Sequence, residues 1–152
     1  MSDWSIMKKY KEVVFVCTGN TCRSPMAESL FCHLYPEADI LSRSRGLMVF
    51  EPTPATEYAI KVMHEKGIDI SMHQSQYFSK TSCNSSVLAL TMTHRHKTVL
   101  VQHNYPCDVY SIKEFVGETG DIEDPYGGDL DDYRRCAEEL ERVIKKLGGK
   151  LL

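Results

Sequence analysis

A short loop of small and polar residues carries the side chains best suited to chemistry. Its residues are Cys17, Thr18, Gly19, Asn20, Thr21, Cys22, Arg23 and Ser24. The backbone N–H groups of such a loop converge on one point and bind an anion. The arginine adds a planar guanidinium that matches two oxygens of a phosphate. We therefore expect the residues from Thr18 to Arg23 to hold phosphate or another oxyanion.

The thiol of Cys17 is expected to be a nucleophile. A helix N-terminus and a nearby cation lower a thiol pKa from about 8.5 to roughly 3.5–7.5, so the thiolate prevails at neutral pH. The Ser24 hydroxyl is placed to donate to the sulfur. Attack on phosphorus would give a phosphocysteine intermediate, with Arg23 and the loop amides holding the oxygens.

A leaving group needs a proton, and Asp124 is the expected general acid. It begins the run Asp124-Pro125-Tyr126-Gly127-Gly128, in a long loop rich in glycine, aspartate and proline over residues 117–128. The same carboxylate would then activate water in a second half-reaction.

The remaining sequence supplies elements that position these residues. Apolar runs predict strands over 12–16, 39–44, 87–92 and 107–110. Helical periodicity predicts helices over 24–34, 53–67 and 94–103, and a last helix from 129 that stops at Gly148-Gly149. The alternation of strands and helices predicts an α/β fold with a parallel sheet covered on both faces. Ligands bind beyond the carboxyl ends of such strands, where the Cys17 loop lies.

Length and composition fit one ordinary domain. The chain has 152 residues, of which 42% are hydrophobic and 26% charged, and its net charge is −3. We expect an N-terminal extension over 1–11 and a single domain over 12–152. The weak acidic balance does not favour nucleic acid or a membrane surface. We expect a cytoplasmic monomer without cofactor or metal.

Other polar groups have simpler explanations. The six cysteines lack zinc-ribbon spacing, and Cys32, Cys83, Cys107 and Cys136 are expected to be reduced packing residues. Two histidines at i, i+2 do not share a helix face, so the run His94-Arg95-His96-Lys97 is expected to be a solvated helix start. The acidic run over 121–132 is expected to form a solvated loop and a helix N-terminus.

The chain resembles the low-molecular-weight protein phosphatases from Val13 to the last helix. Four stretches carry the resemblance: Val14 to Glu28, Ser44-Arg45-Gly46, Ala89 to His94, and Asp124 to Gly128. The resemblance implies a three-layer, flavodoxin-like fold with a four-stranded parallel sheet flanked by helices. It also implies Cys17 as nucleophile, Arg23 as phosphate clamp and Asp124 as general acid, acting on phosphorylated proteins.

The resemblance also implies a supporting set of residues. Asn20, Ser24 and Ser44 match positions that hold the loop in shape through hydrogen bonds, and His73 matches a buried structural histidine. Arg45 departs from the family, which usually has a small residue there.

Two positions bear on the phosphorylated side chain. Tyrosine-directed members usually have isoleucine at the position of Thr21, whereas arginine-directed bacterial members have threonine. Tyrosine-directed members often show two adjacent tyrosines after Asp-Pro, whereas here Tyr126 precedes two glycines. The hypothesis is a protein-arginine phosphatase, with a tyrosine phosphatase as the alternative.

Cys22 has a second interpretation. It lies five residues from Cys17, so the two thiols could form a disulfide that protects the nucleophile from irreversible oxidation. The simpler interpretation is a small residue in a tight loop. Spacing alone does not guarantee disulfide geometry.

Two other classes stay open. A thioredoxin-coupled arsenate reductase shares this fold and loop, but its chemistry needs two further cysteines on a mobile segment, and only Cys83 lies in a suitable region. The other class is a catalytically inactive module that binds phosphoproteins. The presence of both Cys17 and Asp124 argues against it.

Overall fold

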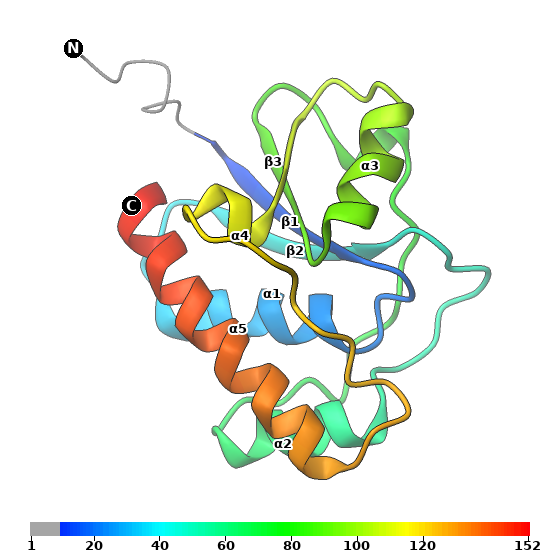
Figure 1. Ribbon diagram of the computed structural model, residues 1–152, viewed down its shortest axis with the longest axis vertical. Coiled ribbons are helices and arrows are strands. Elements are labelled where there is room, and N and C mark those ends of the chain that lie inside the picture. The colour runs from blue at the N-terminus through cyan, green and yellow to red at the C-terminus, as the bar shows by residue number, and fades with distance from the viewer. Residues whose placement is uncertain (1–9) are drawn as a thin grey trace.

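Four parallel strands form the centre of the molecule. The computed structural model describes residues 10–152, and its sheet has the strand order β2-β1-β3-β4. All three strand pairs are parallel. The strands are β1 (Glu12–Cys17), β2 (Leu41–Gly46), β3 (Val87–Thr91) and β4 (Asp108–Ser111). The predicted four-stranded parallel sheet is confirmed (Figure 1).

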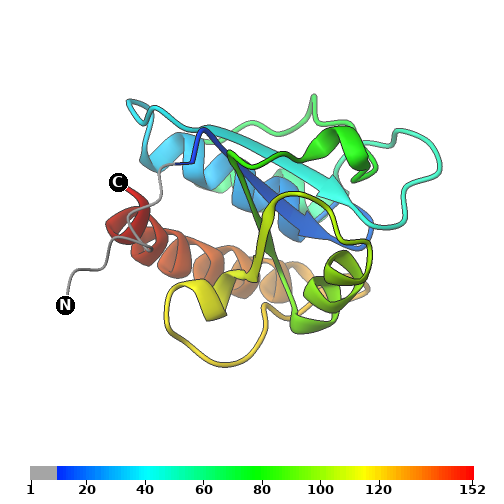
Figure 2. The same ribbon diagram turned by 90° about the horizontal axis from the view of Figure 1, so that it is seen from above.

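Helices cover both faces of the sheet, as expected for this class. They are α1 (Arg23–Leu34), α2 (Glu57–Glu65), α3 (His94–Gln102), α4 (Ile112–Phe115) and α5 (Leu130–Leu151), with a short 3-10 turn, η2 (Lys80–Ser82). In Figure 1, α1 and α2 lie below the strands and α3 lies above them. Figure 2 shows α1 and α5 running side by side, consistent with their packing in one core.

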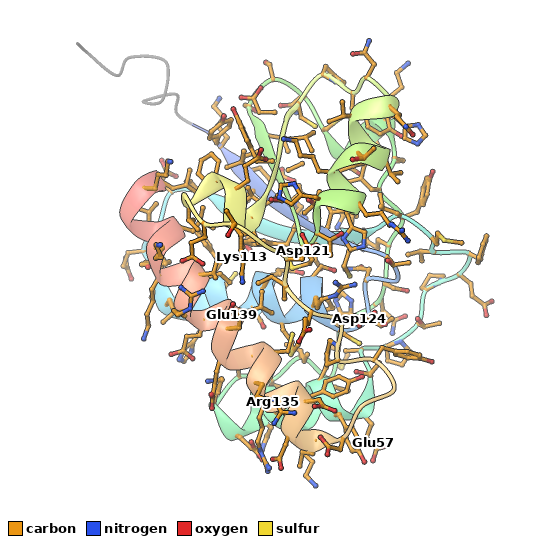
Figure 3. The ribbon with its side chains drawn as sticks, viewed as in Figure 1. Glu57, Lys113, Asp121, Asp124, Arg135 and Glu139 are labelled. Carbon is orange, nitrogen blue, oxygen red and sulfur yellow. The ribbon has the colours of Figure 1, made fainter. Side chains whose placement is uncertain are left out.

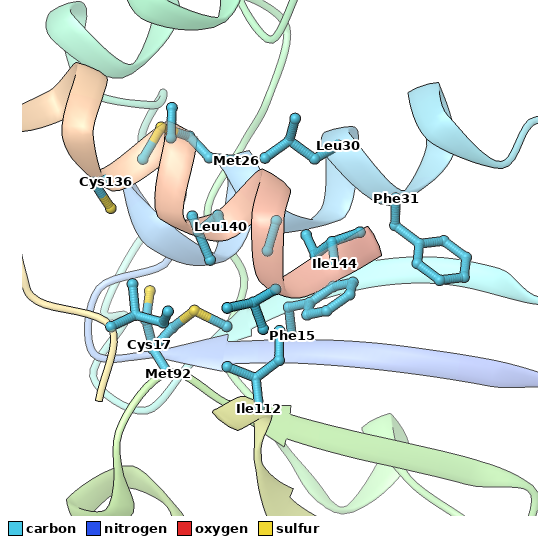
Figure 4. Packing of buried hydrophobic residues seen from close by; sticks show 14 of the residues in the cluster. Phe15, Cys17, Met26, Leu30, Phe31, Met92, Ile112, Cys136, Leu140 and Ile144 are labelled. Carbon is cyan, nitrogen blue, oxygen red and sulfur yellow. The ribbon is translucent and has the colours of Figure 1, made fainter. Parts of the chain in front are cut away.

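Alternation along β1 divides the core in two. Phe15 and Cys17 face a large apolar cluster that contains α1 and α5, whereas Val14 and Val16 face a smaller cluster under α3. Figure 4 shows Cys17 at the edge of the large cluster, close to Met92 and below α5. Cys17 thus lies at the end of β1, at the carboxyl edge of the sheet, where ligands of such folds bind.

Several boundaries differ from those predicted. Strand β2 begins at Leu41 and ends at Gly46 instead of spanning 39–44. Helix α2 begins at Glu57 and not at Thr53, because the backbone of Thr53 is hydrogen-bonded to Ser75 on a neighbouring segment. The four-residue helix α4 was not predicted.

The end of α5 is also different from the prediction. The helix continues through Gly148 and Gly149 to Leu151. Gly148 is buried against the ring of Tyr35, and a Cβ atom there would collide with that ring. This glycine therefore permits close packing between helices and does not end the helix.

The N-terminal prediction falls mostly on residues 1–9, which lie outside the described part. The ring of Tyr10 is buried in the large cluster, and Lys11 N–H donates to the Ser86 carbonyl at 2.9 Å. Within residues 10–152, no helix has the length and apolar character to cross a lipid bilayer.

Candidate active site

The loop after β1 surrounds the Cys17 thiol with hydrogen-bonding groups. The Ser24 hydroxyl lies 2.9 Å from the Cys17 sulfur, and the backbone N–H of Asn20 donates to the same sulfur at 3.3 Å. Helix α1 begins at Arg23, directly after the loop, and directs its N-terminus toward the same region. Each of these groups stabilises a thiolate more than a thiol.

Asn20 ties the loop to the rest of the protein. Its φ of 57° is in the left-handed region that asparagine tolerates better than most residues. Its side chain donates to the Ser24 hydroxyl at 2.8 Å and accepts from the Gln76 backbone at 2.9 Å. Its carbonyl lies 2.7 Å from His73 Nε2. Asn20, Ser24 and His73 therefore make the contacts expected of loop support, although His73 is half-buried and not fully buried.

Ser44 behaves differently from the expectation. Its hydroxyl donates to Glu28 of helix α1 at 2.5 Å, so this hydrogen bond connects β2 with α1 and does not reach the loop directly. The neighbouring Arg45 is half-buried and donates to the Ser44 carbonyl at 2.6 Å. Burial lowers the pKa of Arg45 from its ordinary value.

The end of β2 supports the loop instead, through backbone contacts. Leu47 N–H donates to the Cys17 carbonyl at 3.0 Å, and Met48 N–H donates to the Thr18 carbonyl at 2.9 Å. Gly46 makes this approach possible. A Cβ atom there would lie 2.9 Å from the Thr18 carbonyl oxygen and 3.0 Å from the Asn20 Cβ.

The side chains of Arg23 and Asp124 form an ion pair at the pocket that contains Cys17. Arg23 is 5% exposed. It donates from Nη1 to the Ile122 carbonyl at 2.9 Å and places Nη2 3.5 Å from Asp124 Oδ2. The Asp124 side chain is 51% exposed, and its other oxygen accepts from Tyr126 N–H at 3.1 Å. Figure 3 shows Asp124 beside the first turn of α1.

These side chains line one pocket of about 230 Å³. Its lining residues are Cys17, Thr18, Gly19, Thr21, Cys22, Arg23, Asp124 and Tyr126. A groove of about 1030 Å³ lies along the loop before α5 and shares Asp124 and Tyr126 with the pocket. The smaller pocket is the candidate active site because it contains Cys17, the predicted nucleophile. The structure thus brings the three predicted catalytic residues to one place.

His96 was wrongly expected to be solvated. It is 6% exposed, and its Nε2 atom lies 2.9 Å from the Thr18 hydroxyl of the loop. His94 and Arg95 on the same turn are exposed, as expected. The sequence offered no signal for this contact, which joins residues that are far apart in the chain.

Two further supports of the site were not predicted. They are the Ile122 carbonyl, which accepts from Arg23, and the Gln76 N–H, which donates to Asn20. Both are backbone groups, and a backbone group has no residue type that a motif could reveal.

All six cysteines are free thiols. Cys22 is buried, 3.5 Å from the Thr56 hydroxyl and 3.6 Å from the Tyr133 hydroxyl. Burial raises the pKa of Cys136 to about 12, so that thiol stays protonated. Cys32 is exposed, so the expectation that it is a packing residue is wrong.

The family model for low molecular weight phosphotyrosine protein phosphatases matches residues 12–151. The chain belongs to this family. A protein-arginine-phosphatase of Bacillus subtilis is 37% identical over 145 residues, covering 92% of this chain and 96% of the relative. A low molecular weight protein-tyrosine-phosphatase of Staphylococcus haemolyticus is 40% identical over 136 residues, covering 89% and 96%.

Solved structures of the family agree with this fold. A low molecular weight protein tyrosine phosphatase from T. tengcongensis has a TM-score of 0.86 at 41% identity, covering 92% of this chain and 99% of that one. An arginine phosphatase mutant with a phosphorylated active-site serine in place of cysteine has a TM-score of 0.87 at 37% identity, covering 92% and 95%. The predicted flavodoxin-like architecture is therefore confirmed.

Proposed function

We propose that this phosphatase removes phosphate from phosphorylated proteins, with Cys17 as nucleophile, Arg23 as phosphate clamp and Asp124 as general acid. The observation that carries the proposal is the meeting of these three side chains at one pocket, with Arg23 Nη2 3.5 Å from Asp124. The phosphorylated serine of the related arginine phosphatase supports a covalent phosphoenzyme at the nucleophile.

In the first step the Cys17 sulfur attacks phosphorus as the bond to the leaving group breaks. The leaving group departs with the electron pair and takes a proton from Asp124, while Arg23 and the loop amides hold the phosphoryl oxygens. The Ser24 hydroxyl, 2.9 Å from the sulfur, stabilises the thiolate before the attack.

In the second step water attacks the phosphocysteine. Asp124, now a carboxylate, accepts the proton of that water, and the sulfur–phosphorus bond breaks. Inorganic phosphate and the Cys17 thiolate are regenerated. The thiolate is again stabilised by Ser24 and the Asn20 N–H.

The favoured substrate is phosphoarginine. Thr21 lines the pocket, and among residues 10–152 its hydroxyl has one hydrogen-bonding contact, a long one of 4.0 Å to the Cys22 sulfur. A polar guanidine leaving group and the attacking water both benefit from a hydroxyl at this place. Two relatives whose alignments each cover more than 90% of this chain are named protein-arginine-phosphatase, which supports the same substrate.

The alternative substrate is phosphotyrosine. The ring of Tyr126 is 73% exposed at the rim of the pocket, where it could stack on an aryl leaving group. The Staphylococcus haemolyticus relative, with 40% identity, is named a tyrosine phosphatase. The arsenate-reductase alternative is disfavoured because Cys83 packs in the cluster on the opposite face of the sheet from Cys17.

The test compares hydrolysis of phosphoarginine and phosphotyrosine peptides by the wild type, Thr21→Ile and Thr21→Val. Valine keeps the shape of threonine without the hydroxyl, so it separates polarity from bulk. We expect the wild type to prefer phosphoarginine. Both variants should lower the ratio of phosphoarginine to phosphotyrosine turnover about ten-fold, the effect of losing one hydrogen bond.

A wild type that prefers phosphotyrosine would overturn the substrate assignment but not the mechanism. The mechanism is tested separately with Cys17→Ser, which should abolish turnover of both peptides. We infer phosphoprotein partners, a monomeric state and a cytoplasmic location, and size-exclusion chromatography of the purified protein tests the monomer.

A further inference from the structure

One buried imidazole contacts the phosphate loop from outside. His96 lies in the first turn of α3 and is 6% exposed. Its Nε2 atom is 2.9 Å from the Thr18 hydroxyl, whereas its Nδ1 atom is buried without a hydrogen-bond partner among residues 10–152. Thr18 itself is exposed and lines the pocket that holds Cys17.

The imidazole is neutral at physiological pH. Burial, followed by the positive charge of Arg23, lowers the pKa of His96 to about 4, although Asp121 and Asp124 act in the opposite direction. A neutral ring carries one proton, on either Nδ1 or Nε2. The two tautomers give Thr18 opposite roles.

The surroundings of the ring favour the proton on Nε2. A proton on Nδ1 would leave a buried N–H without an acceptor, and buried N–H groups without a partner are rarer in proteins than under-used acceptors. With the proton on Nε2, the ring donates to the Thr18 oxygen. The hydroxyl proton of Thr18 is then free to point into the pocket.

We propose that His96 is a positioning residue that, by donating to Thr18, directs the Thr18 hydroxyl proton toward the phosphoryl group of the substrate. Thr18 would then add a side-chain donor to the backbone donors of the loop. This inference rests on the proposed phosphate chemistry of the Cys17 loop but not on the choice between phosphoarginine and phosphotyrosine.

The start of α3 is held firmly enough for this task. The Thr93 hydroxyl accepts from the His96 backbone at 3.1 Å and caps the helix. Asp121, on the loop that carries Asp124, accepts from His94 N–H at 2.9 Å. The first turn of α3 therefore contacts two loops, the one that contains Thr18 and the one that contains Asp121 and Asp124 (Figure 3).

The experiment is a double-mutant cycle on the full chain with His96→Phe, Thr18→Val and the double variant. Inorganic phosphate is the probe, through its inhibition constant and its binding heat, and kcat is measured with p-nitrophenyl phosphate. Each single variant should weaken phosphate binding about ten-fold. The double variant should be no weaker than the single ones, because both remove the same donor.

Two variants guard against a purely structural effect. His96→Gln offers an amide N–H near the position of Nε2 and should restore most of the phosphate affinity. His94→Gln removes an exposed imidazole two residues away and should leave it unchanged. Melting temperatures of all variants are compared, and if His96→Phe does not fold, Thr18→Val and His96→Gln decide the result.

Phosphate affinities within two-fold of the wild type for both single variants would overturn the inference, as would additive losses in the double variant. A wild type that neither binds phosphate nor loses turnover with Cys17→Ser would overturn the proposed function as well. An active, Cys17-dependent wild type with additive losses would overturn the role of His96 alone.

Discussion

Arg23 and Asp124, from opposite ends of the chain, form an ion pair of 3.5 Å at the mouth of the pocket. A phosphate entering the loop competes with the Asp124 carboxylate for the guanidinium. Arg23 retains its hydrogen bond to the Ile122 carbonyl on the same loop. Substrate binding is thus linked to the position of Asp124 through a single side chain.

Asp124→Asn should lower kcat by about 10²–10⁴ for substrates with poor leaving groups, because the leaving atom loses its proton donor. The loss should be smaller for p-nitrophenyl phosphate, whose leaving group is stable as an anion. The measurement is kcat across a series of aryl phosphates. Glu123→Gln, an exposed neighbour on the same loop, is the control and should change little. An equal loss for every leaving group would contradict the acid role.

Gly46→Ala should destabilise the protein by about 1–3 kcal/mol, because the new methyl group meets the Thr18 carbonyl and Asn20 at 2.9 and 3.0 Å. The free energy of unfolding in urea measures this effect. Gly149→Ala is the matched control, since nothing lies within 4 Å of its Cβ position, and it should be neutral or stabilising by about 0.5–1 kcal/mol. An unchanged free energy of unfolding for Gly46→Ala would contradict this prediction and would mean that the loop moves to make room for the methyl group.

Stability should fall as the pH decreases from 6.5 to 4. The folded pKa of His96 is about 4, below its ordinary 6.5, so the unfolded chain binds a proton in this range while the folded protein does not. Above pH 6.5 His96 is unprotonated in both the folded and the unfolded chain, so it no longer makes stability depend on pH. The free energy of unfolding in urea should decrease less for His96→Phe than for the wild type over this range. The difference should reach roughly 1–3 kcal/mol at pH 4. Parallel curves would show that His96 does not titrate as described.

Peroxide should inactivate the wild type reversibly. Peroxide converts the Cys17 thiolate to a sulfenic acid, and the Cys22 thiol then attacks that sulfur with loss of water to form a disulfide. Dithiothreitol should restore activity. Cys22→Ser should instead become irreversibly inactive, and Cys32→Ser, at an exposed thiol, should behave as the wild type. Mass spectrometry reports the loss of two hydrogens in the wild type, and its absence would contradict the guard role of Cys22.

The central elements were predictable because their signals are local. The apolar run at β1 and the proline after Ser24 predicted the strand, the loop and the start of α1. The proline at position 54 led to the wrong prediction for the start of α2. Thr53 is hydrogen-bonded to Ser75, and the helix begins only after Thr56, its N-cap. That pairing depends on a segment distant in sequence.

The site was predictable to the same extent. Cys17, Arg23 and Asp124 have residue types that chemistry requires, and the structure brings them together. The burial of His96 was not predicted, because helical spacing relates His96 only to neighbours on its own helix. Its partner, Thr18, lies in the loop after β1, and only the folded chain brings the two side chains together.

The segment from His73 to Gln76 has a consequence for how such an enzyme could evolve. It holds Asn20 at two points without lining the pocket. Substitutions there can shift the loop, and with it the rate, while every substrate-contacting side chain stays the same. We expect variants selected for altered turnover to accumulate in this segment as readily as in the pocket itself.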